Sequence, residues 1–275
     1  YLWKGGSIFG DWLFDKSMRQ TENDGYTSPD MIATMFYAYS SKLLAQTAAV
    51  LGKTADEKIY NDIFEKVKNA FNKNYVTTAG RIASESQTAY VLALNFNLLP
   101  NEMRPIATQY LVDDIKGRGN HLSTGFLGTP YLCHVLTENG RSDVAYDLLL
   151  QESFPSWLYP VKMGATTIWE RWDGQKTDST FQDVGMNSFN HYAIGSVGEW
   201  LYRSILGING EKAGFKSFII HPVIGGSLSY ARGSYHSVAG IISVSWRKEN
   251  GSLSMEVEIP VNTTATVVMP AGNGI

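Results

Sequence analysis

The first part of the chain carries two long runs in which hydrophobic positions recur with helical spacing. Ser28-Pro29 indicates an N-cap followed by a first-turn proline, and it opens a run that ends near Leu51-Gly52. Thr54 and Glu57 form a capping-box pattern. Apolar residues then fall on one helical face, at Ile59, Ile63, Val67, Ala70 and Phe71. The pattern predicts two long helices joined by a short turn.

Further runs of the same kind follow, separated by short polar turns. They predict helices over about 86–99, 101–116, 129–138, 141–152 and 187–206. Antiparallel helices joined by short turns are typical of a helical array or an α/α toroid, in which the loops at one end build a cleft. The periodicity does not by itself show that such a ring closes.

The pattern changes after Gly210, where short β-rich runs with apolar and polar residues in alternation replace the helical spacing. Asn250-Gly251 lies between two of these runs and is a strong hairpin signal. We therefore predict a helical part over residues 1–208 and a small antiparallel β-sandwich over residues 209–275 that need not be complete at Ile275. The expected strands span 215–222, 227–238, 240–247, 253–259 and 263–269.

A long irregular connection separates the last two predicted helices. Residues 154–185 show no regular period, and a connection of this length inside a helical domain is usually functional or disordered. Its content of Trp, Phe and Ile argues against disorder. Within it, the stretch Gly164-Ala-Thr-Thr-Ile-Trp-Glu-Arg-Trp-Asp-Gly174 places the carboxylate of Glu170 between two indoles.

This mixture of residue types suits carbohydrate chemistry. Flat apolar rings pack against the C–H faces of a sugar, and charged groups address its hydroxyls and the glycosidic oxygen. A tryptophan-rich packing strand, with Glu170 and Arg171 on a solvated edge, accounts for the same residues without any function. Both interpretations stay open on composition alone.

Charge and composition exclude several classes of function. The formal net charge of −3 gives no electrostatic footprint for nucleic acid, and no apolar run is long enough for membrane insertion. The single cysteine, Cys133, permits no internal disulfide, and its neighbours Leu132 and Val135 indicate an inert core position. The histidines lack zinc-ligand spacing and no Walker-type glycine loop occurs, so we expect neither a metal nor a cofactor.

Five segments carry a resemblance to a known family. They are Phe9-Gly-Asp-Trp-Leu13, Gln87-Thr-Ala-Tyr-Val-Leu-Ala-Leu94, Leu122-Ser-Thr-Gly-Phe-Leu-Gly-Thr129, Gly164 to Gly174 as written above, and Met186-Asn-Ser-Phe-Asn-His-Tyr-Ala-Ile-Gly195. Together, and in this order, they resemble bacterial α-L-rhamnosidases of glycoside hydrolase family 78. The resemblance implies a partial (α/α)6 catalytic barrel followed by a C-terminal β-sandwich.

The resemblance also implies an activity and a set of site residues. Enzymes of this family remove terminal α-L-rhamnose with inversion, which needs two carboxylates about 6.5–9.5 Å apart with a water between one of them and the anomeric carbon. By resemblance, Glu170 is the general base, His191 lines the rhamnose subsite and Trp12 packs against the sugar. The neighbouring side chains are assigned to substrate binding: Asp11, Trp169, Trp172 and Arg171.

One departure from the family pattern limits what the chain can do. The family's general acid lies in an acidic segment upstream of the Gly-Asp-Trp motif, and no such segment occurs here. The chain starts at Tyr1 without a methionine, which we interpret as a piece of a longer protein. We therefore expect a rhamnose-containing glycoside or oligosaccharide as substrate of that longer protein, and no useful activity from the piece alone.

Two other functions remain compatible with the sequence. One is a different carbohydrate enzyme on an α/α toroid, such as another inverting glycosidase or a polysaccharide lyase, although the acidic centre around Glu170 favours hydrolysis. The other is a non-catalytic sugar-binding module in which Glu170 only accepts hydrogen bonds. A lone histidine such as His191 is also more often structural than catalytic. The aglycone, the linkage, the compartment and the oligomeric state are not set by the sequence.

Overall fold

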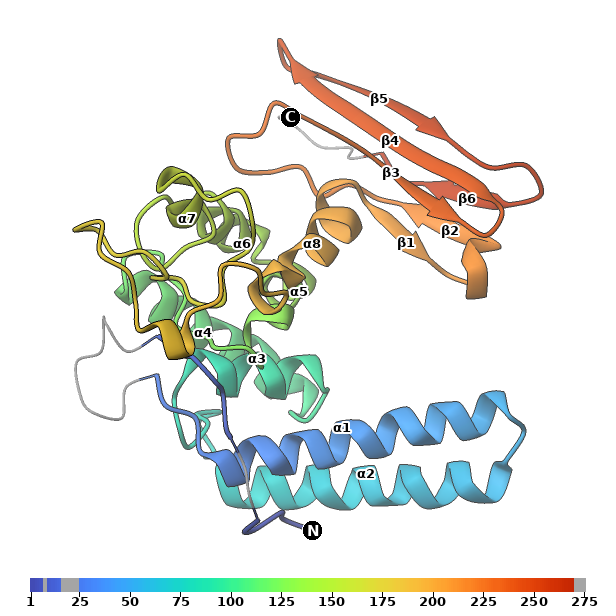
Figure 1. Ribbon diagram of the computed structural model, residues 1–275. Helices are drawn as coiled ribbons and strands as arrows, with labels where there is room; N and C mark the ends of the chain where they lie inside the picture. Colours follow the sequence, from blue (N-terminus) through green and yellow to red (C-terminus); the bar gives the residue numbers. More distant parts are fainter. Residues whose placement is uncertain (7–8, 16–24, 270–275) are drawn as a thin grey trace. The chain divides into compact units, whose positions relative to one another are not determined.

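The computed structural model describes residues 1–6, 9–15 and 25–269, and it divides into two compact units (Figure 1). Tyr1–Ile194 is helical, and Gly195–Ile275 carries all the described strands. The last six residues of the expected β part, 270–275, lie outside the described residues. No helix in the described ranges is long and apolar enough to cross a membrane.

The two long predicted helices form an antiparallel hairpin. Helix α1 (Pro29–Val50) begins at the expected proline and is followed by Gly52 with a φ of 67°, a conformation that glycine adopts without strain. Helix α2 (Thr54–Tyr75) runs back beside it (Figure 1). The capping box is wrong in detail, because Thr54 is already helical and Lys53 precedes it without a side-chain cap. The helices themselves are confirmed.

Shorter helices pack as further pairs. Helix α3 (Gln87–Asn95) contacts both α4 (Arg104–Gly117) and α5 (Thr129–Glu138), and α5 contacts α6 (Ser142–Leu149). Every residue of α3 from Gln87 to Leu94 is buried, so this helix lies at the centre of the helical unit. Its first turn is capped by the Ser86 hydroxyl, which accepts a hydrogen bond from the Ala89 amide.

The last predicted helix begins later than its sequence indicates. Helical structure starts at Ala193 with a 3₁₀ turn and continues through α8 (Val197–Trp200) into a π-helical turn, Leu201–Ile205. Residues 187–192 are not helical, because backbone groups of Ser188 and His191 bond to residues 168–170 instead. The connection before them also holds a short helix that the periodicity does not reveal, α7 (Leu158–Lys162).

Up to residue 269, where the described part ends, the second unit contains two three-stranded sheets. One has the order β1-β2-β6 and the other β3-β4-β5. Asn250-Gly251 forms the predicted two-residue hairpin between β4 and β5, with a positive φ at both positions as a type I′ turn requires. Strand β6 pairs with β2 in parallel, whereas the other pairs are antiparallel. The strands are β1 (Ile208–Gly210), β2 (Ser217–Ile220), β3 (Tyr230–Ser237), β4 (Gly240–Glu249), β5 (Ser252–Glu258) and β6 (Thr264–Val267).

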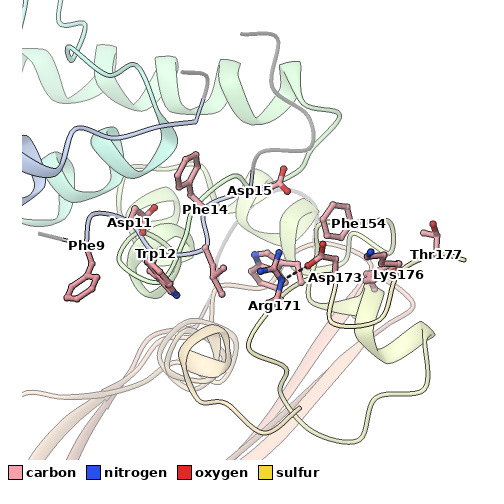
Figure 2. Close-up of a pocket in the computed structure, with 13 residues that line it drawn as sticks. Phe9, Asp11, Trp12, Phe14, Asp15, Phe154, Arg171, Asp173, Lys176 and Thr177 are labelled. Atoms are coloured by element: carbon pink, nitrogen blue, oxygen red, sulfur yellow. Dashed lines mark hydrogen bonds and ion pairs between the residues drawn. The ribbon is translucent and has the colours of Figure 1, made fainter. Parts of the chain in front are cut away.

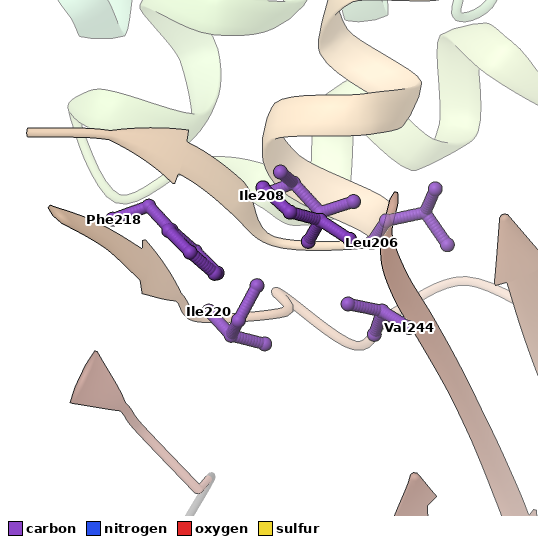
Figure 3. Packing of buried hydrophobic residues seen from close by; sticks show 6 residues of the cluster. Leu206, Ile208, Phe218, Ile220 and Val244 are labelled. Atoms are coloured by element: carbon purple, nitrogen blue, oxygen red, sulfur yellow. The ribbon is translucent and has the colours of Figure 1, made fainter. Parts of the chain in front are cut away.

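Residues from both sheets supply the core of the second unit. Ile208, Phe218 and Ile220 from one sheet meet Val244 from the other, with Leu206 beside them (Figure 3). At the edge of this core, the buried Trp246 indole donates a hydrogen bond of 2.7 Å to the Ile205 carbonyl. The apolar alternation seen in the sequence therefore marks the side chains that hold the two sheets together.

Cys133 lies on α5 as a buried, free thiol, as predicted. Burial raises the pKa of this thiol to about 12, so the reactive thiolate is scarce near neutral pH. We expect a maleimide or disulfide reagent at pH 8 to leave the folded chain unmodified and to modify it fully in denaturant. Mass spectrometry over a urea series measures this directly, and rapid modification without urea would contradict the buried position.

Candidate active site

Two stretches separated by residues 171–187 run side by side and carry Glu170 and His191. The Glu170 amide donates to the Ser188 carbonyl over 2.8 Å, and the His191 amide donates to the Ile168 carbonyl over 2.9 Å. The Glu170 side chain is also held, because its Oε2 accepts a hydrogen bond of 2.9 Å from the Ser188 amide. Glu170 is partly exposed, and among the described residues none donates to its Oε1.

The two indoles beside Glu170 are packing residues. Trp169 and Trp172 are both buried, and their rings meet Phe189 and Trp157 edge-on, with centroids 5.2 and 5.4 Å apart. In the sequence they flank Glu170, whose side chain stays partly exposed. Packing thus accounts for the burial of both indoles, and a partly exposed Glu170 also agrees with the solvated edge of the non-functional interpretation.

His191 is held in one orientation by its surroundings. Its imidazole stacks on the Phe126 ring, with centroids 5.1 Å apart and planes at 27°. Its Nδ1 accepts a hydrogen bond of 3.3 Å from the Ala193 amide. In the neutral ring this assigns the proton to Nε2, which is then a donor.

The Gly-Asp-Trp motif brings an aromatic side chain to the surface. Trp12 is 43% exposed and meets Phe9 edge-on, with centroids 6.1 Å apart. Its carbonyl accepts a hydrogen bond of 2.9 Å from the Phe126 amide. Trp12 and His191 therefore contact the same residue, Phe126, from two different parts of the chain.

A cavity of about 700 Å³ lies between the Gly-Asp-Trp motif and the segment after Glu170 (Figure 2). Residues 9–15 face it from one side, and residues 171–177 with Phe154 face it from the other. Its volume is in the range of small-molecule sites, and its walls combine aromatic rings with charged groups. Glu170 and His191 are not among its lining residues.

Of the residues predicted from sequence, four line this cavity: Asp11, Trp12, Arg171 and Trp172. Arg171 is engaged in an ion pair of 3.1 Å with Asp173, the residue two positions along, and Figure 2 shows this pair inside the cavity wall. Trp169 packs against Phe189 and lies close to Gly174 instead. The sequence interpretation missed the lining residues Phe154, Tyr159 and Lys176, because they lie outside its quoted motifs.

Two family models together match nearly the whole chain. Residues 2–205 match the bacterial alpha-L-rhamnosidase 6 hairpin glycosidase domain, and residues 207–274 match the bacterial alpha-L-rhamnosidase C-terminal domain. The chain belongs to the bacterial α-L-rhamnosidase family. This confirms the resemblance carried by the five sequence motifs, and with it the partial six-hairpin helical region followed by a small β domain.

Similar proteins include several α-L-rhamnosidases. The enzyme of Streptomyces avermitilis is 45% identical over 96% of this chain and 25% of its own length, and one from Formosa agariphila is 42% identical over 96% and 29%. Among solved structures, the Streptomyces avermitilis α-L-rhamnosidase complexed with L-rhamnose has a TM-score of 0.89 at 44% identity, covering 96% of this chain and 25% of that one.

A fungal structure is equally close in fold. The native α-L-rhamnosidase from Aspergillus terreus has a TM-score of 0.90 at 35% identity, covering 97% of this chain and 31% of that one. In each comparison this chain spans less than a third of the relative's own length. The chain therefore corresponds to one portion of such an enzyme.

Proposed function

We propose that the chain supplies the general base and part of the sugar subsite of an inverting α-L-rhamnosidase. The observation that carries the proposal is the placement of Glu170, whose Oε2 is fixed by the Ser188 amide while its Oε1 has no donor among the described residues. Membership of the family supports it, as does the relative whose structure holds L-rhamnose. The substrate is then a glycoside or oligosaccharide with a terminal α-L-rhamnose.

In the proposed reaction, Glu170 takes a proton from a water molecule. The water oxygen attacks the anomeric carbon from the face opposite the leaving group, the glycosidic C–O bond breaks, and a general acid protonates the departing oxygen. Glu170 suits the base role because one carboxylate oxygen is anchored and the other remains available to solvent. We place the general acid in a segment outside these 275 residues.

Trp12 and His191 bind the sugar in this proposal. The exposed face of Trp12 packs against the apolar face of rhamnose, and the Nε2–H of His191 donates to a hydroxyl. Trp172 and Arg171 line the neighbouring cavity and contact the substrate from there, whereas Trp169 packs against Phe189.

Inversion predicts the first product that leaves the enzyme. We expect the longer enzyme that carries this chain to release β-L-rhamnose first from an aryl α-L-rhamnoside, and the α-anomer to appear only by later mutarotation. Proton NMR of the anomeric signals during the first minutes distinguishes the two. Early accumulation of α-L-rhamnose would contradict inversion, and no hydrolysis at all would contradict the proposed function.

The 275-residue chain by itself is expected to show no useful turnover. Absence of the general acid leaves the departing oxygen unprotonated, which costs about 10²–10⁴-fold for that role alone. Assays of the chain and of the longer enzyme with the same aryl α-L-rhamnoside measure the difference. Turnover by the chain near that of the longer enzyme would show that both catalytic groups lie within these residues.

A further inference from the structure

The Asp11 carboxylate is buried and fully engaged by other parts of the helical unit. Its Oδ2 accepts hydrogen bonds from the Thr88 hydroxyl and, over 2.8 Å, from the Gly125 amide. Its Oδ1 accepts from the amides of Leu127 at 2.8 Å and Gly128 at 3.4 Å. A carboxylate offers about four acceptor positions, so these four donors leave none for a ligand.

The loop at residues 125–128 is shaped to approach this carboxylate. A Cβ added at Gly125 would overlap the Trp12 carbonyl oxygen and lie 2.8 Å from Asp11 Oδ1. A Cβ added at Gly128 would overlap the Thr88 hydroxyl. Glycine at both positions therefore lets backbone amides of the 122–129 motif come within hydrogen-bond distance of Asp11 in the Gly-Asp-Trp motif. This contact links the two motifs in the structure.

The same loop carries Phe126, which bonds to the backbone of Trp12 and contacts the side chain of His191. Between the two clamped amides at 125 and 127, Phe126 donates its own amide to the Trp12 carbonyl and stacks its ring on His191. The position of the Phe126 ring thus depends on the loop that Asp11 holds. Leu13, next to Trp12, adopts a φ of 56°, a strained conformation for leucine that persists only where surrounding contacts enforce it.

We propose that Asp11 is a positioning residue that does not touch the sugar: by clamping the 125–128 loop it fixes Phe126, and through Phe126 the relative positions of Trp12 and His191. The inference rests on the proposed function, in which these two side chains bind rhamnose. It revises the binding role that the sequence resemblance gave to Asp11.

Asp11→Asn tests the clamp because the amide has the same shape but turns an N–H₂ group toward two donors. In the longer enzyme we expect the inhibition constant for L-rhamnose to rise about tenfold or more, with KM rising alongside. Phe126→Ala keeps the amide that bonds to Trp12 and removes the ring that stacks on His191. In this background the same change is expected to raise the inhibition constant by a clearly smaller factor, because the part of the effect that reaches His191 is already lost. Equal effects in both backgrounds would overturn the proposal.

Folding is separated from positioning by a second pair of variants. Thr88→Val removes one donor to Asp11, and Thr88→Ser keeps it, so only the valine variant is expected to weaken L-rhamnose inhibition. Thermal unfolding of each variant gives the folded fraction. A lower melting temperature with an unchanged inhibition constant, for both Asp11→Asn and Thr88→Val, would show a purely structural role and reject the inference.

A readout without catalysis separates this inference from the proposed function. In the ¹⁵N-histidine-labelled 275-residue chain, Asp11→Asn is expected to shift the ring signals of His191, because they report stacking on Phe126. The signals of His236, on β3 in the other unit, are expected to stay in place. If His191 shifts and the longer enzyme has no rhamnosidase activity, the proposed function is rejected and the positioning role of Asp11 stands. If His191 does not shift, the positioning role is rejected.

Discussion

In the longer enzyme that carries this chain, Glu170→Gln is expected to lower kcat for α-L-rhamnoside hydrolysis by about 10²–10⁴-fold and to change L-rhamnose affinity only slightly. Glutamine has the same length and offers an oxygen to the Ser188 amide, so the local structure is kept. Its amide nitrogen cannot take a proton from water. The loss therefore falls on the chemical step and not on binding.

Asp178→Asn is the matched control for this experiment. Asp178 belongs to the same irregular connection, but its carboxylate is exposed and accepts only local hydrogen bonds from Thr180. We expect the control to keep kcat within about twofold, as for most surface substitutions. Equal losses in both variants would remove Glu170 from the base role, and a protein with no turnover to lose would be a sugar-binding module.

Gly207→Ala is expected to destabilise the β unit by at least about 3 kcal/mol. Gly207 has a φ of 77°, and an added Cβ would overlap the backbone where His221 joins Pro222, reaching within 2.6 Å of the His221 nitrogen. That backbone cannot move aside without loss, because the His221 amide donates to the Gly207 carbonyl over 2.9 Å. Strand β1 begins at the next residue and pairs with β2, so the clash also strains that pairing.

Gly251→Ala distinguishes the free-energy cost of the steric clash from the cost of the left-handed backbone conformation. Gly251 lies in the same unit with a φ of 75°, but nothing is within 4 Å of an added Cβ. Only the left-handed conformation is penalised there, at about 1–2 kcal/mol. Urea unfolding followed by near-ultraviolet circular dichroism compares the two variants, and equal losses of free energy would show that the space around Gly207 is irrelevant.

Local sequence patterns predicted the parts of the fold that depend on neighbouring residues. The start of α1 follows from Ser28-Pro29, and the β4–β5 hairpin follows from Asn250-Gly251, because proline and glycine restrict or permit backbone angles directly. The parallel pairing of β6 with β2 has no such local signal. It depends on the chain leaving the first sheet after β2, forming β3, β4 and β5 in the other sheet, and returning to the first sheet as β6.

The candidate site shows the same division between local and distant information. Glu170 stands out in sequence because its unusual neighbours are adjacent to it. The non-helical course of residues 187–192 was missed, because it is set by hydrogen bonds to residues 168–170 that override a helical pattern. The contribution of Phe126 was missed for the same reason, since its partners Trp12 and His191 are distant in the chain.

The long sequence separation of the Asp11 contacts has a consequence for how the protein is made. The Gly125 amide follows Asp11 by 114 residues. At about 5–20 residues per second, a ribosome needs about 6–23 s to supply that partner after Asp11 itself. Until then Asp11 lacks its backbone donors, so the Gly-Asp-Trp segment takes up its final position only after residues 125–128 have been synthesised.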